Sequence, residues 1–222
     1  MTNLAIVLGV LVGARHAFEP DHLAAISTLV TGTRTPRSAS LLGLIWGLGH
    51  TLALLGVGLG LVLAGGLLPA QLANAFELAV AGMLVVLGIR AIVRGLRNTE
   101  GHGGLHRHGG IAHAHIGAHD HIHVGDRAFA WRPLTIGIVH GLAGSGALTA
   151  LAFAELPTTS ARVIYMLLFG IGSVAGMTLA TGIAGSVLAR ISRGRGAQRV
   201  LAVTTGTVSC ICGVLWALPL VG

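Results

Sequence analysis

Six long apolar segments occupy most of this chain, and they restrict it to folds that satisfy backbone hydrogen bonds without water. They lie at about 3–30, 39–65, 72–94, 133–155, 161–189 and 198–220, and each is long enough to cross a bilayer. In hydrocarbon, only helices and closed β-barrels satisfy every backbone group, and single apolar runs of this length form helices. We therefore predict an all-α, polytopic membrane protein with six transmembrane helices.

The composition supports the same class. Hydrophobic residues make up 53% of the chain and charged residues only 9%, compared with about 25% charged residues in soluble domains. The net charge of +7 would suggest a nucleic-acid partner in a soluble protein. Here the arginines lie mostly in the connections between apolar segments, so we expect a lipid bilayer as the partner and no nucleic acid.

Arginine placement predicts the orientation in the membrane. The arginines in or next to the first, third and fifth connections are Arg34, Arg37, Arg90, Arg94, Arg97, Arg107, Arg127, Arg132, Arg190, Arg193, Arg195 and Arg199. Only Arg162 lies in a connection on the opposite side. Because positive residues stay in cytoplasmic loops, we expect these three connections to be cytoplasmic and both termini to lie outside a bacterial inner membrane.

The two halves of the chain resemble each other at a nearly constant offset. His16 lies 124 residues before His140, and each follows a glycine by three residues. With three spans in each half, the second half would be inverted relative to the first, as in many secondary transporters. The predicted units are a first half at 1–97, a linker at 98–131 and a second half at 132–222.

The seven residues from His16 to His22 carry four ionisable side chains inside the first apolar segment. Such groups are costly in hydrocarbon unless they pair or bind a ligand, and imidazole with carboxylate suits a divalent first-row metal. On a straight helix His16, Asp21 and His22 would not share a face, but Pro20 cannot donate to the carbonyl of residue 16 and breaks the helix. We predict a local unwinding that gathers these three side chains around one ion and frees the His16 carbonyl. The alternative is a polar kink held by interhelical hydrogen bonds.

Two further residues are candidates for the same site. Glu19 has three open roles, as a metal ligand, a proton acceptor or a partner for Arg15, and we favour an ion-pairing or orienting role. His50 lies in the second segment, and we predict that it is a ligand or a gate. The glycines on either side of Leu48 would let its helix approach the first span closely.

The second half repeats this pattern only in part. His140 is the counterpart of His16, but Ser145 stands at the position of Asp21. The second half has therefore kept one histidine and lost the acid. His140 and Ser145 are possible pathway residues, and for His140 a purely structural role is equally open.

The linker is rich in histidine. Its histidines are His102, His106, His108, His113, His115, His119, His121 and His123. Because glycine and alanine fill most of the gaps, this composition cannot form a packed core, and we expect a disordered segment that captures transition-metal ions loosely. The alternative is a solvated linker whose histidine content is incidental.

The remaining polar residues of the apolar segments have simpler interpretations. Glu77 and Glu155 fall near the predicted outer ends of their spans, where we expect their side chains to reach toward the membrane surface. Cys210 and Cys212 would point in different directions from one helix, and we interpret them as packing residues. We find no nucleotide-binding loop, nucleophile elbow or zinc-protease pattern, and we expect neither an enzyme nor a prosthetic group.

These residues resemble those of a known family. His16-x4-Asp21-His22 is similar to the signature of nickel/cobalt transporters, and Gly49-His50-Thr51 resembles the second histidine motif of that family. The resemblance covers all six spans and implies a permease for Ni²⁺ or Co²⁺, with His16, Asp21 and His22 as metal ligands and His50 in the pathway. The chain looks closest to the six-span branch found alongside urease or hydrogenase genes.

The predicted function is secondary transport of Ni²⁺, and also of Co²⁺, with uptake favoured. Cytoplasmic nickel chaperones are candidate partners. The runner-up is efflux of the same ions, with the linker capturing them for extrusion. A different class is a membrane-bound accessory protein that delivers nickel to urease or hydrogenase maturation without translocating it.

Overall fold

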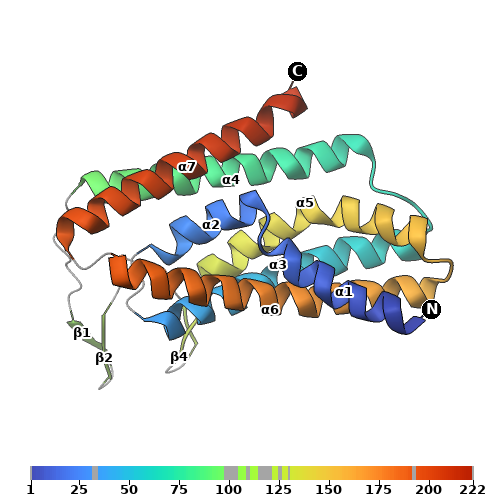
Figure 1. The fold of residues 1–222 in the computed structure, drawn as a ribbon, viewed down its shortest axis with the longest axis horizontal. Helices are drawn as coiled ribbons and strands as arrows, with labels where there is room; N and C mark the ends of the chain where they lie inside the picture. Colours follow the sequence, from blue (N-terminus) through green and yellow to red (C-terminus); the bar gives the residue numbers. More distant parts are fainter. Residues whose placement is uncertain are drawn as a thin grey trace.

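The described part of the chain is almost entirely helical, as predicted (Figure 1). The computed structural model describes residues 2–31, 35–97, 105–108, 111–114, 122–124, 127–129, 131–191 and 194–221. Its helices are α1 (Thr2–His16), α2 (Pro20–Val30), α3 (Pro36–Ala64), α4 (Ala70–Leu96), α5 (Trp131–Glu155), α6 (Thr159–Ile191) and α7 (Arg195–Val221). In the described residues, α3, α4, α6 and the Gly196–Val221 part of α7 are long and apolar enough to cross a membrane on their own.

The first apolar segment is divided into two helices where Pro20 predicts a break. Pro20 occupies the first turn of α2, and Glu19 before it has extended backbone angles (φ −65°, ψ 151°), as expected for the residue before a proline. The prediction that the His16 carbonyl is freed is wrong. That carbonyl accepts a hydrogen bond of 3.1 Å from the Glu19 backbone N–H, because the chain turns tightly enough to replace the donor that proline lacks.

The helices pack in two layers, and their axes run in roughly the same direction (Figure 1). α4 and α7 lie side by side, α3 packs against both α5 and α6, and α1 packs against α6. The N-terminus and the α3–α4 and α5–α6 connections lie at one end of the bundle, and the strands of the linker lie beyond the other end. The N-terminus therefore lies at the same end of the bundle as these two connections.

Glycine allows two of these helix pairs to approach at backbone distance. A Cβ on Gly13 of α1 would overlap the carbonyl of Phe169 in α6, and a Cβ on Gly137 of α5 would overlap the carbonyl of Trp46 in α3. Lipid gives no hydrophobic drive for helix pairing, so small residues at the crossing are what permit tight van der Waals packing. These two crossings join α1 to α6 and α5 to α3, each three residues before a histidine (His16 and His140).

The cysteines of α7 pack as predicted. Cys210 donates to the Val85 carbonyl of α4 at 3.5 Å, and Cys212 packs against the buried core with Leu29 and Met83. Both thiols are free. They therefore belong to the α4–α7 layer.

The linker contains short strands, which the expectation of a disordered segment did not include. β1 (Leu105–His108) pairs antiparallel with β2 (Ile111–Ala114), and β3 (Ile122–Val124) with β4 (Arg127–Phe129). The prediction is wrong for these strands, because a hairpin satisfies backbone groups locally without a packed core. The sequence signal is the pair of residues between the strands, Gly-Gly at 109–110 and Gly-Asp at 125–126, which are typical of two-residue hairpin connections.

Candidate metal centre

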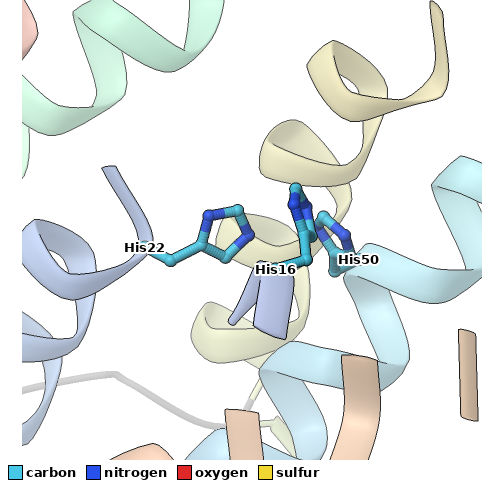
Figure 2. Close-up of side chains that lie close together, drawn as sticks. All are labelled: His16, His22 and His50. Carbon is cyan, nitrogen blue, oxygen red and sulfur yellow. The ribbon is translucent and has the colours of Figure 1, made fainter. Parts of the chain in front are cut away.

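Histidines from α1, α2 and α3 lie close together (Figure 2). His16 is the last residue of α1, His22 lies in the first turn of α2, and His50 lies near the middle of α3. The helix break lets one chain segment present His16 and His22 to the same point. The ring centroids are 4.4 Å apart for His16 and His22, and 5.3 Å from each of these to His50.

The three imidazoles lie close enough together to bind one metal ion. One ring nitrogen from each lies within 4.8 Å of the other two. Nitrogens bound to one first-row ion at about 2.1 Å are at most about 4.2 Å apart. Small side-chain rotations would therefore bring all three into coordination distance.

Their facing nitrogens also lack any protein partner. Nε2 of His16, Nε2 of His22 and both nitrogens of His50 are buried without a hydrogen bond. An unsatisfied buried polar group costs about 1–3 kcal/mol, and native structures contain few of them. Several orphaned nitrogens that converge on one point are explained by a ligand that binds lone pairs, and a cation is such a ligand.

Carboxylates hold the opposite side of two of these rings. Glu19 Oε1 accepts from His16 Nδ1 at 3.0 Å, and Asp21 Oδ1 accepts from His22 Nδ1 at 3.0 Å. A hydrogen bond from the remote nitrogen to a carboxylate is the usual support of a metal-binding histidine, since it fixes the ring and raises its basicity. Glu19 therefore has the contact expected of the orienting role favoured from sequence, and it pairs with His16 rather than with Arg15.

Asp21 also joins a second group. Its Oδ2 accepts from His140 Nε2 of α5 at 2.7 Å, and the His22 and His140 ring centroids are 4.1 Å apart. Asp21, His22 and His140 thus form a second candidate metal group that shares His22 with the first. The sequence predicted His16, Asp21 and His22 around one point, whereas the structure places His16 and Asp21 in different groups.

The centre is dry. Asp21, His22, His50 and His140 are each 6% exposed or less. Trp46 lies over His22 and His140, with centroid distances of 5.6 and 5.8 Å, and Phe169 lies 5.4 Å from His16. Charge interactions are stronger where water is excluded, so an ion in this centre would feel the Asp21 charge strongly.

Trp46 and Phe169, the two aromatic residues that pack against the histidines, were not identified from the sequence. Trp46 and Phe169 are 123 residues apart, close to the repeat offset, and this is the signal that would have paired them. The side chain of Ser145 lies outside the described residues, as do the side chains of the linker histidines.

A cavity of about 290 Å³ lies beside the histidines. His16, His22 and His140 line it together with the carboxylates of Glu19 and Asp21. Glu77 of α4, which the sequence placed near the membrane surface, is also on its wall. The cavity gives an ion room to approach the buried nitrogens.

Comparison with known proteins agrees with this chemistry. Residues 2–214 match the model of the NicO family, described as high-affinity nickel-transport protein. The chain is 31% identical over 215 residues to the urease accessory protein UreH of Bacillus sp. (strain TB-90), with 94% of this chain and 88% of the relative covered. It is 28% identical over 171 residues to the chloroplast protein FOR GROWTH AND FERTILITY 2 of Arabidopsis thaliana, covering 76% of this chain and 44% of that protein.

No solved structure matches the chain. The family match spans nearly its whole length, and it confirms the resemblance to nickel transporters predicted from the histidine motifs. The chain belongs to the NicO family of high-affinity nickel-transport proteins.

Proposed function

We propose that this protein is a secondary transporter that carries Ni²⁺, and also Co²⁺, through a site formed by His16, His22 and His50. The observation that carries the proposal is the convergence of unpartnered imidazole nitrogens from α1, α2 and α3. Neutral imidazoles suit Ni²⁺, Co²⁺, Cu²⁺ and Zn²⁺ better than Mg²⁺ or Ca²⁺. The family match favours nickel within that group.

Asp21 and His140 complete the site in this proposal. Asp21 holds His22 and His140 and supplies a negative charge beside the bound cation. With His22 and His140 it also offers a second set of ligands. We assign the ion to the three-histidine group because its facing nitrogens have no other partner.

We further propose six spans arranged as a 3+3 inverted repeat. The α1–α2 pair, α3 and α4 would then correspond to α5, α6 and α7. This assignment is supported by the packing, because contacts made by helices of one half have a counterpart in the other. The repeat relates the α1–α6 contact to the α5–α3 contact, and the α2–α7 contact to the α5–α4 contact. The α3–α6 and α4–α7 pairs each join a helix to its own counterpart.

Close glycine contacts support the same repeat. A Cβ on Gly49 would overlap the Leu134 carbonyl, and a Cβ on Gly172 would overlap the Val10 carbonyl. Gly49 and Gly172 are 123 residues apart, and Val10 and Leu134 are 124 apart. The crossings of Gly13 with Phe169 and of Gly137 with Trp46 are related by the same offsets.

Arginine placement supports a bacterial inner-membrane location with both termini outside and the linker in the cytoplasm. Uptake is the favoured direction, because a relative is named a urease accessory protein and the matching family is described as high-affinity nickel-transport protein. The histidine-rich linker would then hold the arriving ion for cytoplasmic nickel chaperones. The same relative's name also favours the second candidate function, delivery of nickel without translocation.

Uptake of radioactive nickel into proteoliposomes tests the proposal. We expect flux with the wild type, at least tenfold less flux with His22→Ala, and unchanged flux with Phe18→Ala. Phe18 is a matched control because it lies in the same helix break with its side chain 47% exposed. Nickel binding without any wild-type flux would favour the accessory function, and wild-type flux in His22→Ala would refute the site.

Cells separate the two directions of transport. Deletion of the gene lowers cellular nickel and raises nickel tolerance if the protein imports the ion, and it raises cellular nickel and lowers nickel tolerance if the protein exports it. A lowered tolerance would overturn uptake while leaving the site intact.

A further inference from the structure

Carboxylates are rare in the helical part of this chain, and most of them face one cavity. Outside the linker the acidic residues are Glu19, Asp21, Glu77 and Glu155. The first three line the 290 Å³ cavity beside the histidines, which we call the acidic cavity. The protein has a net charge of +7, yet three of these four carboxylates line the same cavity. The electrostatic potential in the cavity should therefore be negative, opposite to the net charge of the protein.

Glu77 is the member of this set that the three-histidine site does not use. It is the eighth residue of α4, about 10 Å along the helix from its start, and its side chain is half-buried. Among the described residues it has no hydrogen bond or ion pair. A carboxylate at this depth in a membrane helix is costly unless it serves an ion path.

The other charged and titratable groups on the cavity wall suit a cation. The wall contains Glu19, Asp21 and three histidines, and its described lining includes no arginine. Clefts lined by one sign of charge concentrate ions of the opposite sign. The described lining therefore favours entry of a cation and disfavours an anion.

Buried unpartnered nitrogens on the same wall point to the ion's destination. His22 is 1% exposed, and its Nε2 has no hydrogen-bond partner; the same is true of His140 and its Nδ1. Glu19, at the other extreme, has a side chain that is 51% exposed. The cavity wall thus runs from a solvated carboxylate to dry imidazole nitrogens.

We propose that Glu77 is a positioning residue of the ion path, which holds a hydrated divalent cation in the acidic cavity before the cation passes to the histidines. This inference rests on the proposed transport function. Glu77 on α4 and Glu19 at the α1–α2 break contribute carboxylates from two different elements to one wall. A hydrated ion binds to such carboxylates through its waters, and it sheds those waters only where the three imidazoles can replace them.

The test measures initial rates of nickel uptake in proteoliposomes over a range of nickel concentrations. The proteins are the full-length wild type, Glu77→Gln, Glu77→Asp and Glu155→Gln, which removes the same charge from α5. Field focusing by a charged cleft raises local ion concentration by about 10- to 1000-fold. One of three carboxylates should account for about a third of that logarithm, so we expect the half-saturating concentration in Glu77→Gln to rise by roughly 2- to 10-fold.

Three further results are expected. The maximal rate of Glu77→Gln stays within about twofold of the wild type, and nickel bound per chain at equilibrium is unchanged, because the histidines are intact. The increase in half-saturating concentration shrinks at high salt, since the Debye length falls from about 30 Å at 0.01 M to about 3 Å at 1 M. Glu77→Asp and Glu155→Gln behave like the wild type.

Several outcomes would overturn the inference. These are an unchanged half-saturating concentration in Glu77→Gln, an equal change in Glu155→Gln, or a salt-independent defect accompanied by loss of equilibrium binding, which would indicate a packing role. If Glu77→Gln does not give a monodisperse protein, Glu77→Asp decides the question instead. A raised half-saturating concentration in Glu77→Asp together with loss of equilibrium nickel binding would also overturn the inference. Failure of the transport function itself looks different, because then the wild type moves no nickel.

Discussion

Asp21→Asn is the most informative change at the metal centre, because this carboxylate supports two histidines at once. Its two oxygens accept from His22 Nδ1 at 3.0 Å and from His140 Nε2 at 2.7 Å, and the side chain is 8% exposed. An asparagine of the same shape has one carbonyl oxygen and one NH₂ group. At least one of the two histidines must therefore lose its acceptor or change tautomer.

The structure gives two routes to the size of the effect. Loss of one buried hydrogen bond to a charged acceptor costs about 1.5–3 kcal/mol. Removing a residue that supports a metal-binding histidine typically lowers metal affinity by about 10- to 100-fold, which is about 1.4–2.7 kcal/mol at 1.36 kcal/mol per tenfold. The two ranges agree, and we expect nickel affinity to fall by about 10- to 100-fold in Asp21→Asn.

Competition against a coloured chelator, with protein purified in detergent, measures this affinity. Glu19→Gln is the matched comparison, because Glu19 makes the same kind of contact with His16 but is half exposed. Water can replace part of that contact, so its effect should be smaller, at about 3- to 10-fold, below the usual range for such residues. Wild-type affinity in Asp21→Asn, or a larger loss in Glu19→Gln, would refute the assignment of these supporting roles.

Three other changes test the helix break, a helix crossing and the linker. In Pro20→Ala the backbone regains its donor, so α1 can continue into α2, and His22 would then lie about 120° around the helix from His16. Nickel binding measured by equilibrium dialysis should fall by at least about tenfold, and the unfolding temperature should stay the same or rise. Gly137→Ala should destabilise the protein by about 1–3 kcal/mol in thermal unfolding, because the new Cβ meets the Trp46 carbonyl, whereas Gly60→Ala has open space and should be neutral; equal stability of the two variants would contradict the crossing. Deletion of residues 102–123 should lower nickel retained by cells and leave proteoliposome flux unchanged, and a lost flux would instead place the linker in the transport path.

Local chemistry explains which parts of this structure could be predicted from the sequence. Pro20 acts on its own neighbours, so the break between α1 and α2 followed from the sequence. The same holds for the grouping of His16 with His22, which are close in the chain. His50 was found only because a histidine in an apolar span next to this motif needs an explanation.

Contacts between distant helices account for what was missed. The bond from His140 to Asp21 depends on where α5 lies relative to α2, and no local pattern encodes that distance. Glu77 fell near a span end, where a membrane-surface role is ordinary, and only the packing of α4 beside the histidines puts it on the cavity wall. The freed His16 carbonyl was predicted from a missing donor, but the turn supplied another one from Glu19.

The repeat that we propose is asymmetric, and this asymmetry accounts for a site at the α1–α2 break. At the proposed repeat offset of 124 residues, Pro20 would pair with Gly144 and Glu19 with Ala143. Without the proline, α5 runs unbroken from Trp131 to Glu155, and its histidine has no neighbouring acid to orient it. His140 instead bonds to Asp21 of the first half. In this proposal, α5 is the continuous helix against which the broken first half assembles its ligands. Introducing proline at position 144 would therefore disrupt that support rather than create a second site.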